Sequence, residues 1–174
     1  MVISFSTEMV KKVLGKQAFW GVIIIALGNA AGRVISGIMS DKIGKMKTLI
    51  MFIFFQTLLM FTAAFVINNE NVSIILLLFI ATFIGFSYGS NLTIFPTITK
   101  EKWGMKNFGA NYGFLFTAWG IGGFILSRIS QMLKAQTGSL HWSFILAGSL
   151  LVVALILAFT GSMPTQKNRN TYLK

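Results

Sequence analysis

The stretch GNAAGRVISGIMSDKIGKMK, from Gly28 to Lys47, contains both the apolar interior and the charged end of one predicted helix. The run before it, AFWGVIIIAL, is typical of a membrane-spanning segment, and the stretch closes with one aspartate and three lysines. Arg33 nevertheless lies inside the apolar part. Because an arginine near the middle of a bilayer costs from about 3 to more than 10 kcal/mol, it should face a cavity or a partner. The stretch therefore predicts a membrane span with a polar site on one face.

The composition of the whole chain indicates an integral membrane protein. Of its 174 residues, 55% are hydrophobic and only 11% are charged, whereas a soluble domain has about a quarter charged residues. The net charge of +11 would suggest nucleic acid as the partner of a soluble protein. Here the cations cluster at the ends of apolar runs, where they act as topology signals, so we expect no nucleic-acid partner. Cysteine is absent, and the one histidine, His141, lies beside Trp142 at the start of an apolar run. We expect no metal site and no cofactor.

The apolar runs predict an all-α bundle of membrane-spanning helices. A span needs about 20 apolar residues to cross about 30 Å of hydrocarbon. β-Barrel strands would alternate in hydrophobicity, and runs such as IILLLFIATFIGF do not. The predicted spans are about Ala18–Ser40, Thr48–Ile67, Val72–Thr97, Asn111–Ser130 and Leu140–Gly161. They divide the chain into a leading segment (1–17), a transmembrane bundle (18–161) with loops near 41–47 and 98–110, and a basic tail (162–174).

The distribution of cations predicts the orientation of the bundle. One side of the predicted membrane carries Lys42, Lys45, Lys47, Lys100, Lys102, Lys106, Lys167, Arg169 and Lys174, and the other carries Lys11, Lys12, Lys16, Arg128 and Lys134. The side with more cations is expected to face the cytoplasm. The chain is thus predicted to lie in the cell (inner) membrane with its C-terminus in the cytoplasm.

Three predicted helices bring unusual side chains to a similar depth. Arg33 lies about 12 Å from the cytoplasmic boundary, and Asn29, one turn earlier, can orient its guanidinium. Tyr88 and Asn91 lie on one face of the third span, and Trp119 lies about 12 Å into the fourth. A guanidinium beside aromatic edges and a carboxamide suits a small carboxylate, which arginine binds through two hydrogen bonds.

Structural roles for the same residues remain open. Arg33 could pair with a buried acid, although no Asp or Glu lies inside the five predicted spans, so its partner would come from elsewhere. Tyr88 and Trp119 could serve only to pack helices together. The glycines near them, such as Gly85 and Gly89, are typical of close helix packing.

The loop after the first predicted span carries a recognisable motif. The string Gly37-x-x-x-Asp41-Lys42-x-Gly44-Lys45 resembles the cytoplasmic loop signature of the major facilitator superfamily. In this loop Asp41 can cap or pair with a neighbouring helix end. Gly44 permits a tight reversal of the chain, and the lysines hold the loop inside the cell.

Two longer strings resemble one branch of that superfamily. YGSNLTIFPTITKEKWGMKNFGANYGFLFTAWGIGG is similar to the tenth and eleventh helices of the oxalate/formate antiporter family, which is close to the monocarboxylate porters. GNAAGRVISGIMSDKIG resembles the eighth helix of that family, including its arginine. The resemblance implies helices 8–12 of a twelve-helix fold, with residues 1–17 at the end of helix seven and in an external loop. It also implies two six-helix bundles, substrate at mid-membrane between them, and alternating access by rocking.

One residue departs from the oxalate-carrying branch, in which a lysine follows the Thr-Ala pair of the eleventh helix. Here that position is Trp119. With one cation fewer, charge matching favours a monocarboxylate such as formate, lactate or pyruvate over a dianion. The expected substrate-binding residues are Arg33, Tyr88, Asn91, Trp119 and Asn29.

The expected function is that of the C-terminal portion of a secondary active transporter, working by uniport, antiport or symport. An enzyme is not expected, because the spans contain no carboxylate pair, histidine pair or nucleophile–base set. The resemblance implies that transport needs an N-terminal helix bundle, encoded elsewhere or missing. The alternative is a small, non-transporting membrane interaction protein or the remnant of a split transporter gene.

Overall fold

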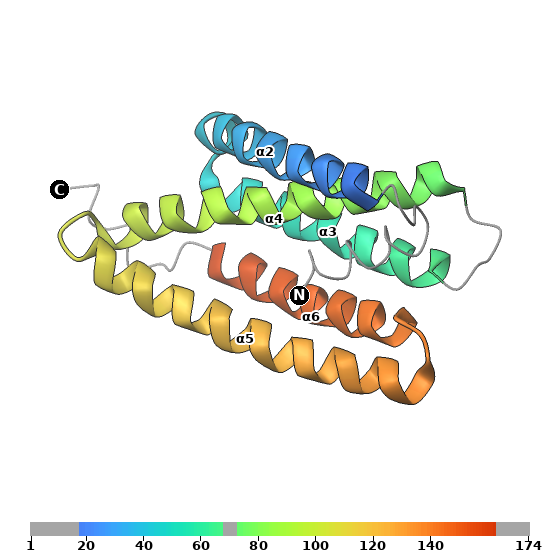
Figure 1. The fold of residues 1–174 in the computed structure, drawn as a ribbon. Coiled ribbons are helices and arrows are strands. Elements are labelled where there is room, and N and C mark those ends of the chain that lie inside the picture. Colours follow the sequence, from blue (N-terminus) through green and yellow to red (C-terminus); the bar gives the residue numbers. More distant parts are fainter. Residues whose placement is uncertain (1–17, 68–72, 163–174) are drawn as a thin grey trace.

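A computed structural model describes residues 18–67 and 73–162 and shows an all-helical bundle (Figure 1). The helices are α2 (Ala18–Ile43), α3 (Lys45–Val66), α4 (Ile74–Trp103), α5 (Phe108–Thr137) and α6 (His141–Ser162). All 5 are long and apolar enough to cross a membrane. The prediction of an all-α bundle of five membrane-spanning helices is therefore confirmed. The leading segment 1–17, the loop 68–72 and the basic tail from residue 163 onward lie outside the described residues.

Helices α4 and α5 are longer than the sequence predicted. α4 continues through Pro96 to Trp103, and α5 begins at Phe108 and extends to Thr137. The loop predicted near 98–110 thus shrinks to the residues around Gly104, and most of the predicted connection QMLKAQTGS is helix. Polar side chains are compatible with a helix that leaves the hydrocarbon, so a change in polarity marks the membrane boundary rather than the helix end.

Glycines mark the actual helix ends. Gly44, Gly104 and Gly138 have φ values of 92°, 72° and 70°, and each lies directly between two helices or after the last residue of one. Only glycine adopts this backbone conformation without a steric penalty from a Cβ atom. The tight reversal predicted at Gly44 is confirmed by its φ of 92°.

The closest contact between helices joins α2 to α4, which run parallel. Four glycines make this contact, and a Cβ atom added to any of them would overlap a backbone carbonyl oxygen of the facing helix. The pairs are Gly28 with Thr82, Gly32 with Phe86, Gly85 with Ile25, and Gly89 with Asn29. The hydroxyl of Ser90 also donates a hydrogen bond across the contact to the carbonyl of Gly32, at 3.2 Å. Two interlocking small-xxx-small motifs therefore join these helices, as is common in membranes.

The hydrophobic core lies where α3, α4 and α6 meet. Buried side chains from the three helices pack together there, including Met60, Ile80, Ile84 and Phe144. At the start of α6, the ring of His141 is hydrogen-bonded to the carbonyl of Ala64 in α3, at 2.7 Å. α5 lies at the edge of the bundle opposite α2 (Figure 1), and Ser130 is its only buried residue.

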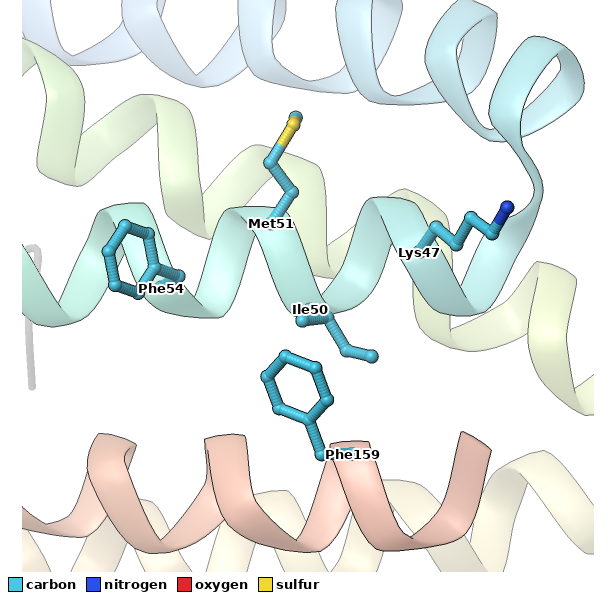
Figure 2. Close-up of a pocket in the computed structure, with 5 residues that line it drawn as sticks. All are labelled: Lys47, Ile50, Met51, Phe54 and Phe159. Atoms are coloured by element: carbon cyan, nitrogen blue, oxygen red, sulfur yellow. The ribbon is translucent and has the colours of Figure 1, made fainter. Parts of the chain in front are cut away.

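A shallow groove of about 300 Å³ separates parts of α3 and α6 near the start of α3 (Figure 2). Its lining is apolar except for one lysine and consists of Lys47, Ile50, Met51, Phe54 and Phe159. Phe159 points from α6 toward Ile50 on α3. Phe54 is 53% exposed, so the groove opens on an outer face of the bundle.

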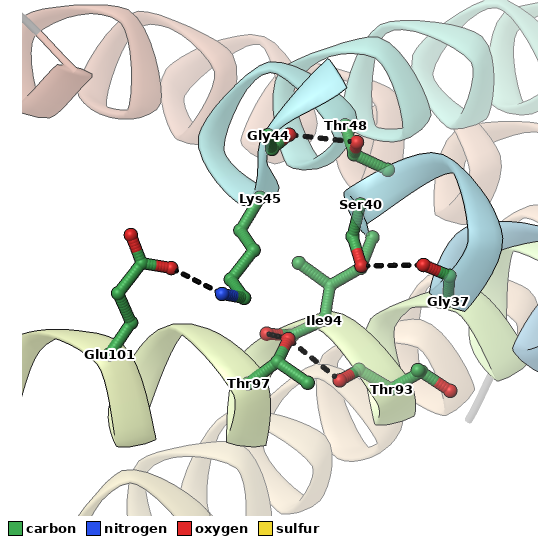
Figure 3. Close-up of polar contacts among 9 residues, drawn as sticks. All are labelled: Gly37, Ser40, Gly44, Lys45, Thr48, Thr93, Ile94, Thr97 and Glu101. Atoms are coloured by element: carbon green, nitrogen blue, oxygen red, sulfur yellow. Dashed lines mark hydrogen bonds and ion pairs between the residues drawn. The ribbon is translucent and has the colours of Figure 1, made fainter. Parts of the chain in front are cut away.

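The loop motif lies where α2 passes into α3 (Figure 3). The carbonyls of Gly37 and Gly44 accept hydrogen bonds from the hydroxyls of Ser40 and Thr48, at 2.8 and 2.9 Å. Lys45 forms an ion pair with Glu101 at the end of α4, with 2.7 Å between Nζ and Oε2.

Of the two roles considered for Asp41, capping does not occur at the helix that follows it. Asp41 lies inside the last turn of α2 and is exposed, and α3 begins after Gly44 without any side-chain cap. Within the described part of the chain, Glu101 rather than Asp41 is the acid that pairs across to another helix. Because α2 continues to Ile43 and the N-cap position of α3 is Gly44, Asp41 lies three residues before the position from which a side chain could cap α3. Lys42, also in that last turn, carries a positive charge at the negative end of the α2 dipole.

Candidate functional site

A hollow with a volume of about 550 Å³ lies between α3, α4 and α5, next to several of the predicted site residues. Most of its lining side chains are aromatic or apolar, and most come from α5. They are Gln56 from α3, Tyr88, Asn91, Leu92 and Phe95 from α4, and Tyr112, Leu115, Phe116, Ala118, Trp119, Gly122, Gly123 and Leu126 from α5. None of these described lining residues carries a formal charge. The hollow can therefore receive an apolar or weakly polar group.

A row of aromatic rings forms one wall of this cavity. Tyr112, Phe116 and Trp119 lie one turn apart on α5, and their ring centroids are separated by 5.4 Å and then 5.0 Å. The ring of Trp119 also contacts Tyr88 on α4, with 6.1 Å between centroids and 41° between ring planes. These tilted arrangements are ones that aromatic pairs prefer. The contact between Tyr88 and Trp119 joins α4 to α5 at this level.

A pair of amides forms the polar part of the cavity. Asn91 Nδ2 donates a hydrogen bond to Gln56 Oε1 at 3.1 Å, which joins α4 to α3. Asn91 Oδ1 is buried and has no partner within the described residues. Sequence analysis predicted Asn91 but missed Gln56. The available signal was a single glutamine in the middle of the apolar segment 48–67, because polar residues inside membrane helices commonly have a specific role.

Arg33 lies beside this cavity rather than among its lining residues. Its Nε donates a hydrogen bond to Asn29 Oδ1 at 3.1 Å, and this oxygen lies close against Gly89 of α4. The residue before Arg33, Gly32, contacts Phe86 and Ser90, so Arg33 is level with the part of α4 that contains Tyr88. The guanidinium is therefore on the same level as the cavity, next to the turn of α4 that forms the cavity wall.

The structure thus divides the five predicted binding residues into two groups. Tyr88, Asn91 and Trp119 line one cavity, whereas Arg33 and Asn29 form a separate pair on α2. Arg33 is exposed, and it has no ion pair with any residue of 18–67 or 73–162. No acidic residue in these ranges neutralises the guanidinium, which leaves its charge available to an anion.

The architecture is that of a membrane-spanning helical bundle with a polar site between its helices. Three of the five membrane-spanning helices line a cavity with amide and aromatic side chains, and Arg33 lies on a fourth helix, at the level of the Tyr88 turn of α4. Polar sites between membrane-spanning helices are typical of transporters. No group of three or more His, Cys, Asp or Glu side chains that could hold a metal ion occurs in the described ranges.

Comparison with known proteins identifies the family. The model of the Major Facilitator Superfamily matches residues 1–173, and the chain belongs to this superfamily of transporters. The chain is also similar to a protein of Escherichia coli (strain K12) named "Uncharacterized MFS-type transporter YhjX". The two are 29% identical over 103 residues, which make up 58% of this chain and 24% of that relative. No solved structure matches the chain. It is a multi-pass membrane protein whose family consists of transporters rather than enzymes.

Proposed function

We propose that the chain is part of a secondary active transporter that moves small organic anions, in particular monocarboxylates such as formate, lactate or pyruvate. The proposal rests mainly on the position and the hydrogen bonding of Arg33. It is a cation inside a membrane-spanning helix, it is held by Asn29, and no acid in the described residues neutralises it. Intramembrane charges are costly, so they commonly mark the path of a charged substrate. The resemblance to the oxalate/formate antiporter family supports the same class.

The hydrogen bonding of Arg33 suits a carboxylate. Its Nε–H is occupied by Asn29, which fixes the plane of the guanidinium. The remaining N–H groups, on the two terminal nitrogens, form a planar fork that can donate two parallel hydrogen bonds to the oxygens of one carboxylate. The cavity contributes no second cation, because Trp119 occupies the position where the oxalate-carrying branch has a lysine. One positive charge matches a monoanion.

We further propose that a second bundle of helices covers the cavity and works with this chain in alternating access. The support is the large amount of apolar surface on the helices that flank the site. On α5, Phe114 and Phe124 are 82% and 68% exposed, and on α2, Leu27 and Val34 are 64% and 62% exposed. The loop that holds Lys45 and the end of α4 that holds Glu101 lie together, and the excess of cations there favours the cytoplasmic side.

A binding measurement on an Arg33→Gln variant tests the proposed carboxylate site. Purified protein in lipid nanodiscs should bind radiolabelled pyruvate or lactate, and R33Q should lose at least about tenfold in affinity, because a charge-assisted hydrogen bond contributes about 1.5–3 kcal/mol. Arg128→Gln is the matched control, since Arg128 is an exposed arginine elsewhere on a membrane helix, and it should bind as the wild type does. Equal affinity of R33Q and wild type would remove Arg33 from the site. Binding of no monocarboxylate by the wild type would contradict the whole proposal.

A further inference from the structure

We infer that the ligand is a monocarboxylate with an aromatic ring, whose ring enters the cavity between α3, α4 and α5 while its carboxylate binds Arg33. This inference rests on the proposed function for the carboxylate, and it adds the chemistry of the remaining part of the ligand. The observations that carry it are the size of the cavity, the uncharged aromatic lining, and the separate position of Arg33.

The cavity has room for more than the carboxylate group of a ligand. A volume of about 550 Å³ would hold on the order of eighteen water molecules at the density of the liquid. Clefts of about 300–1,000 Å³ commonly enclose drug-sized ligands. An anion with one or two carbons would leave most of the cavity wall in contact with water, and it would gain little from burial. A ring-bearing ligand would displace that water from the apolar wall.

The chemistry of the lining favours a ring over a second charged group. Trp119 is 52% exposed and Phe116 is 40% exposed, so parts of their faces and edges are free to contact a ligand. Aromatic rings contact one another at centroid distances of about 4.5–7 Å in stacked or tilted geometry. Trp119 and Tyr88, from two different helices, already lie at 6.1 Å, which shows that the wall presents rings from both sides of the α4–α5 boundary. No described lining residue is charged, so an ionised group would lose its hydration there without a partner.

The position of Arg33 puts the cation at the level of the cavity wall. Asn29 Oδ1, which holds the guanidinium, lies against Gly89, and the next residue back along α4 is Tyr88 in the cavity wall. Successive residues of a helix differ by 1.5 Å in height, so the anchor of the cation and the cavity wall lie at nearly the same level. A ligand that carries both a carboxylate and a ring could therefore contact Arg33 and the cavity wall at one level. Phenylacetate and 3-phenylpropionate are the simplest such compounds.

A matched ligand series tests the inference on the purified chain in nanodiscs. Isothermal titration would compare acetate, phenylacetate, 3-phenylpropionate and phenylacetamide, the last of which keeps the ring and lacks the charge. We expect phenylacetate or 3-phenylpropionate to bind at least tenfold more tightly than acetate. Phenylacetamide should bind at least tenfold more weakly than phenylacetate, and that difference should disappear in R33Q.

Two variants test whether the aromatic ring of the ligand binds in the cavity. Trp119→Leu should weaken the binding of phenylacetate by a much larger factor than it weakens the binding of acetate. Phe54→Leu is the matched control, because Phe54 is an exposed aromatic residue in the outer groove between α3 and α6, and it should change neither. Since Trp119 is half exposed, W119L is expected to fold, and the ligand series on the wild type tests the inference independently of any variant.

The outcomes separate this inference from the proposed function. Equal binding of acetate and phenylacetate, both lost in R33Q, would support the carboxylate site and overturn the inference about the ring. Equal binding of phenylacetate and phenylacetamide, unchanged in R33Q, would support the aromatic cavity and overturn the role of Arg33. Absence of binding by every compound of the series would overturn both.

Discussion

The two sides of α4 show opposite ways of joining membrane helices. On the side that faces α2, Gly85 and Gly89 meet Gly28 and Gly32 so closely that a Cβ atom would overlap a carbonyl of the facing helix. On the side that faces α5, aromatic side chains hold the helices apart and leave a cavity of about 550 Å³. Both sides are largely apolar. The size of the side chains, more than their polarity, therefore decides which contact between helices is tight and which leaves space for a ligand.

A methyl group at the tight boundary should produce the largest change in stability. In Gly32→Ala the new Cβ would overlap the carbonyl of Phe86, and because this atom is backbone it cannot rotate away. Forcing extra atoms into a packed contact costs about 1–3 kcal/mol. We expect a loss of about 2 kcal/mol in the free energy of unfolding, measured by titration with SDS and followed by circular dichroism.

The matched control is Gly120→Ala on α5, where the added Cβ would have nothing within 4 Å. This variant should be as stable as the wild type, or up to about 1 kcal/mol more stable, since alanine is the better helix former. If both variants lost the same stability, the contrast between the two sides of α4 would be wrong.

The amide pair at the cavity should give a smaller change with a distinctive pattern. In Asn91→Leu, Gln56 would lose its partner while it is only 8% exposed. An unsatisfied buried polar group costs about 1–3 kcal/mol, and hydrogen bonds between membrane helices average about 0.6 kcal/mol, so we expect a loss of about 1 kcal/mol. The double variant Gln56→Leu/Asn91→Leu should recover most of it, because neither amide is then left alone. Additive losses in the same SDS titration would show that the two side chains act independently.

The ion pair at the loop should give the smallest change. Lys45 and Glu101 are 31% and 59% exposed, and exposed ion pairs contribute about 0.2–1 kcal/mol, less at high salt. Glu101→Gln should therefore lower the free energy of unfolding by less than about 0.5 kcal/mol, and the loss should shrink as the salt concentration rises. Asp41→Asn is the control, because Asp41 is an exposed acid of the same region without an ion pair in the described residues. A salt-independent loss in Glu101→Gln would indicate a role other than charge pairing.

Much of the fold was predictable because membrane spans have a simple sequence signal. The apolar runs predicted five helices, and the structure contains all of them among the described residues. The ends of α4 and α5 were less predictable, because hydrophobicity reports where the membrane ends and the helix continues beyond it. The glycines Gly104 and Gly138, which have a positive φ directly after α4 and α5, were the better sequence signal for these helix ends.

The sequence predicted how far along its helix each residue of the candidate site lies, but not which neighbouring helix that residue faces. Counting residues along each helix predicted that Arg33, Tyr88 and Trp119 would have similar depths, and the contacts between α2 and α4 give Arg33 and Tyr88 a common level. Depth does not specify which neighbour a helix packs against. The pairing of α2 with α4 rather than mainly with α3, and the entry of Gln56 into the cavity, depend on contacts between distant parts of the sequence that no local pattern encodes.

The glycine contact between α2 and α4 also has a consequence for biosynthesis. Gly32 and Ser90, which bond across it, are 58 positions apart, with the whole of α3 between them. During translation α2 is therefore made well before its main partner, and its glycine face has no complementary surface until α4 has entered the bilayer. This delay sets the order in which the bundle assembles. α3 must first cross the membrane and return the chain to the side where α2 began, because only from that side can α4 insert parallel to α2.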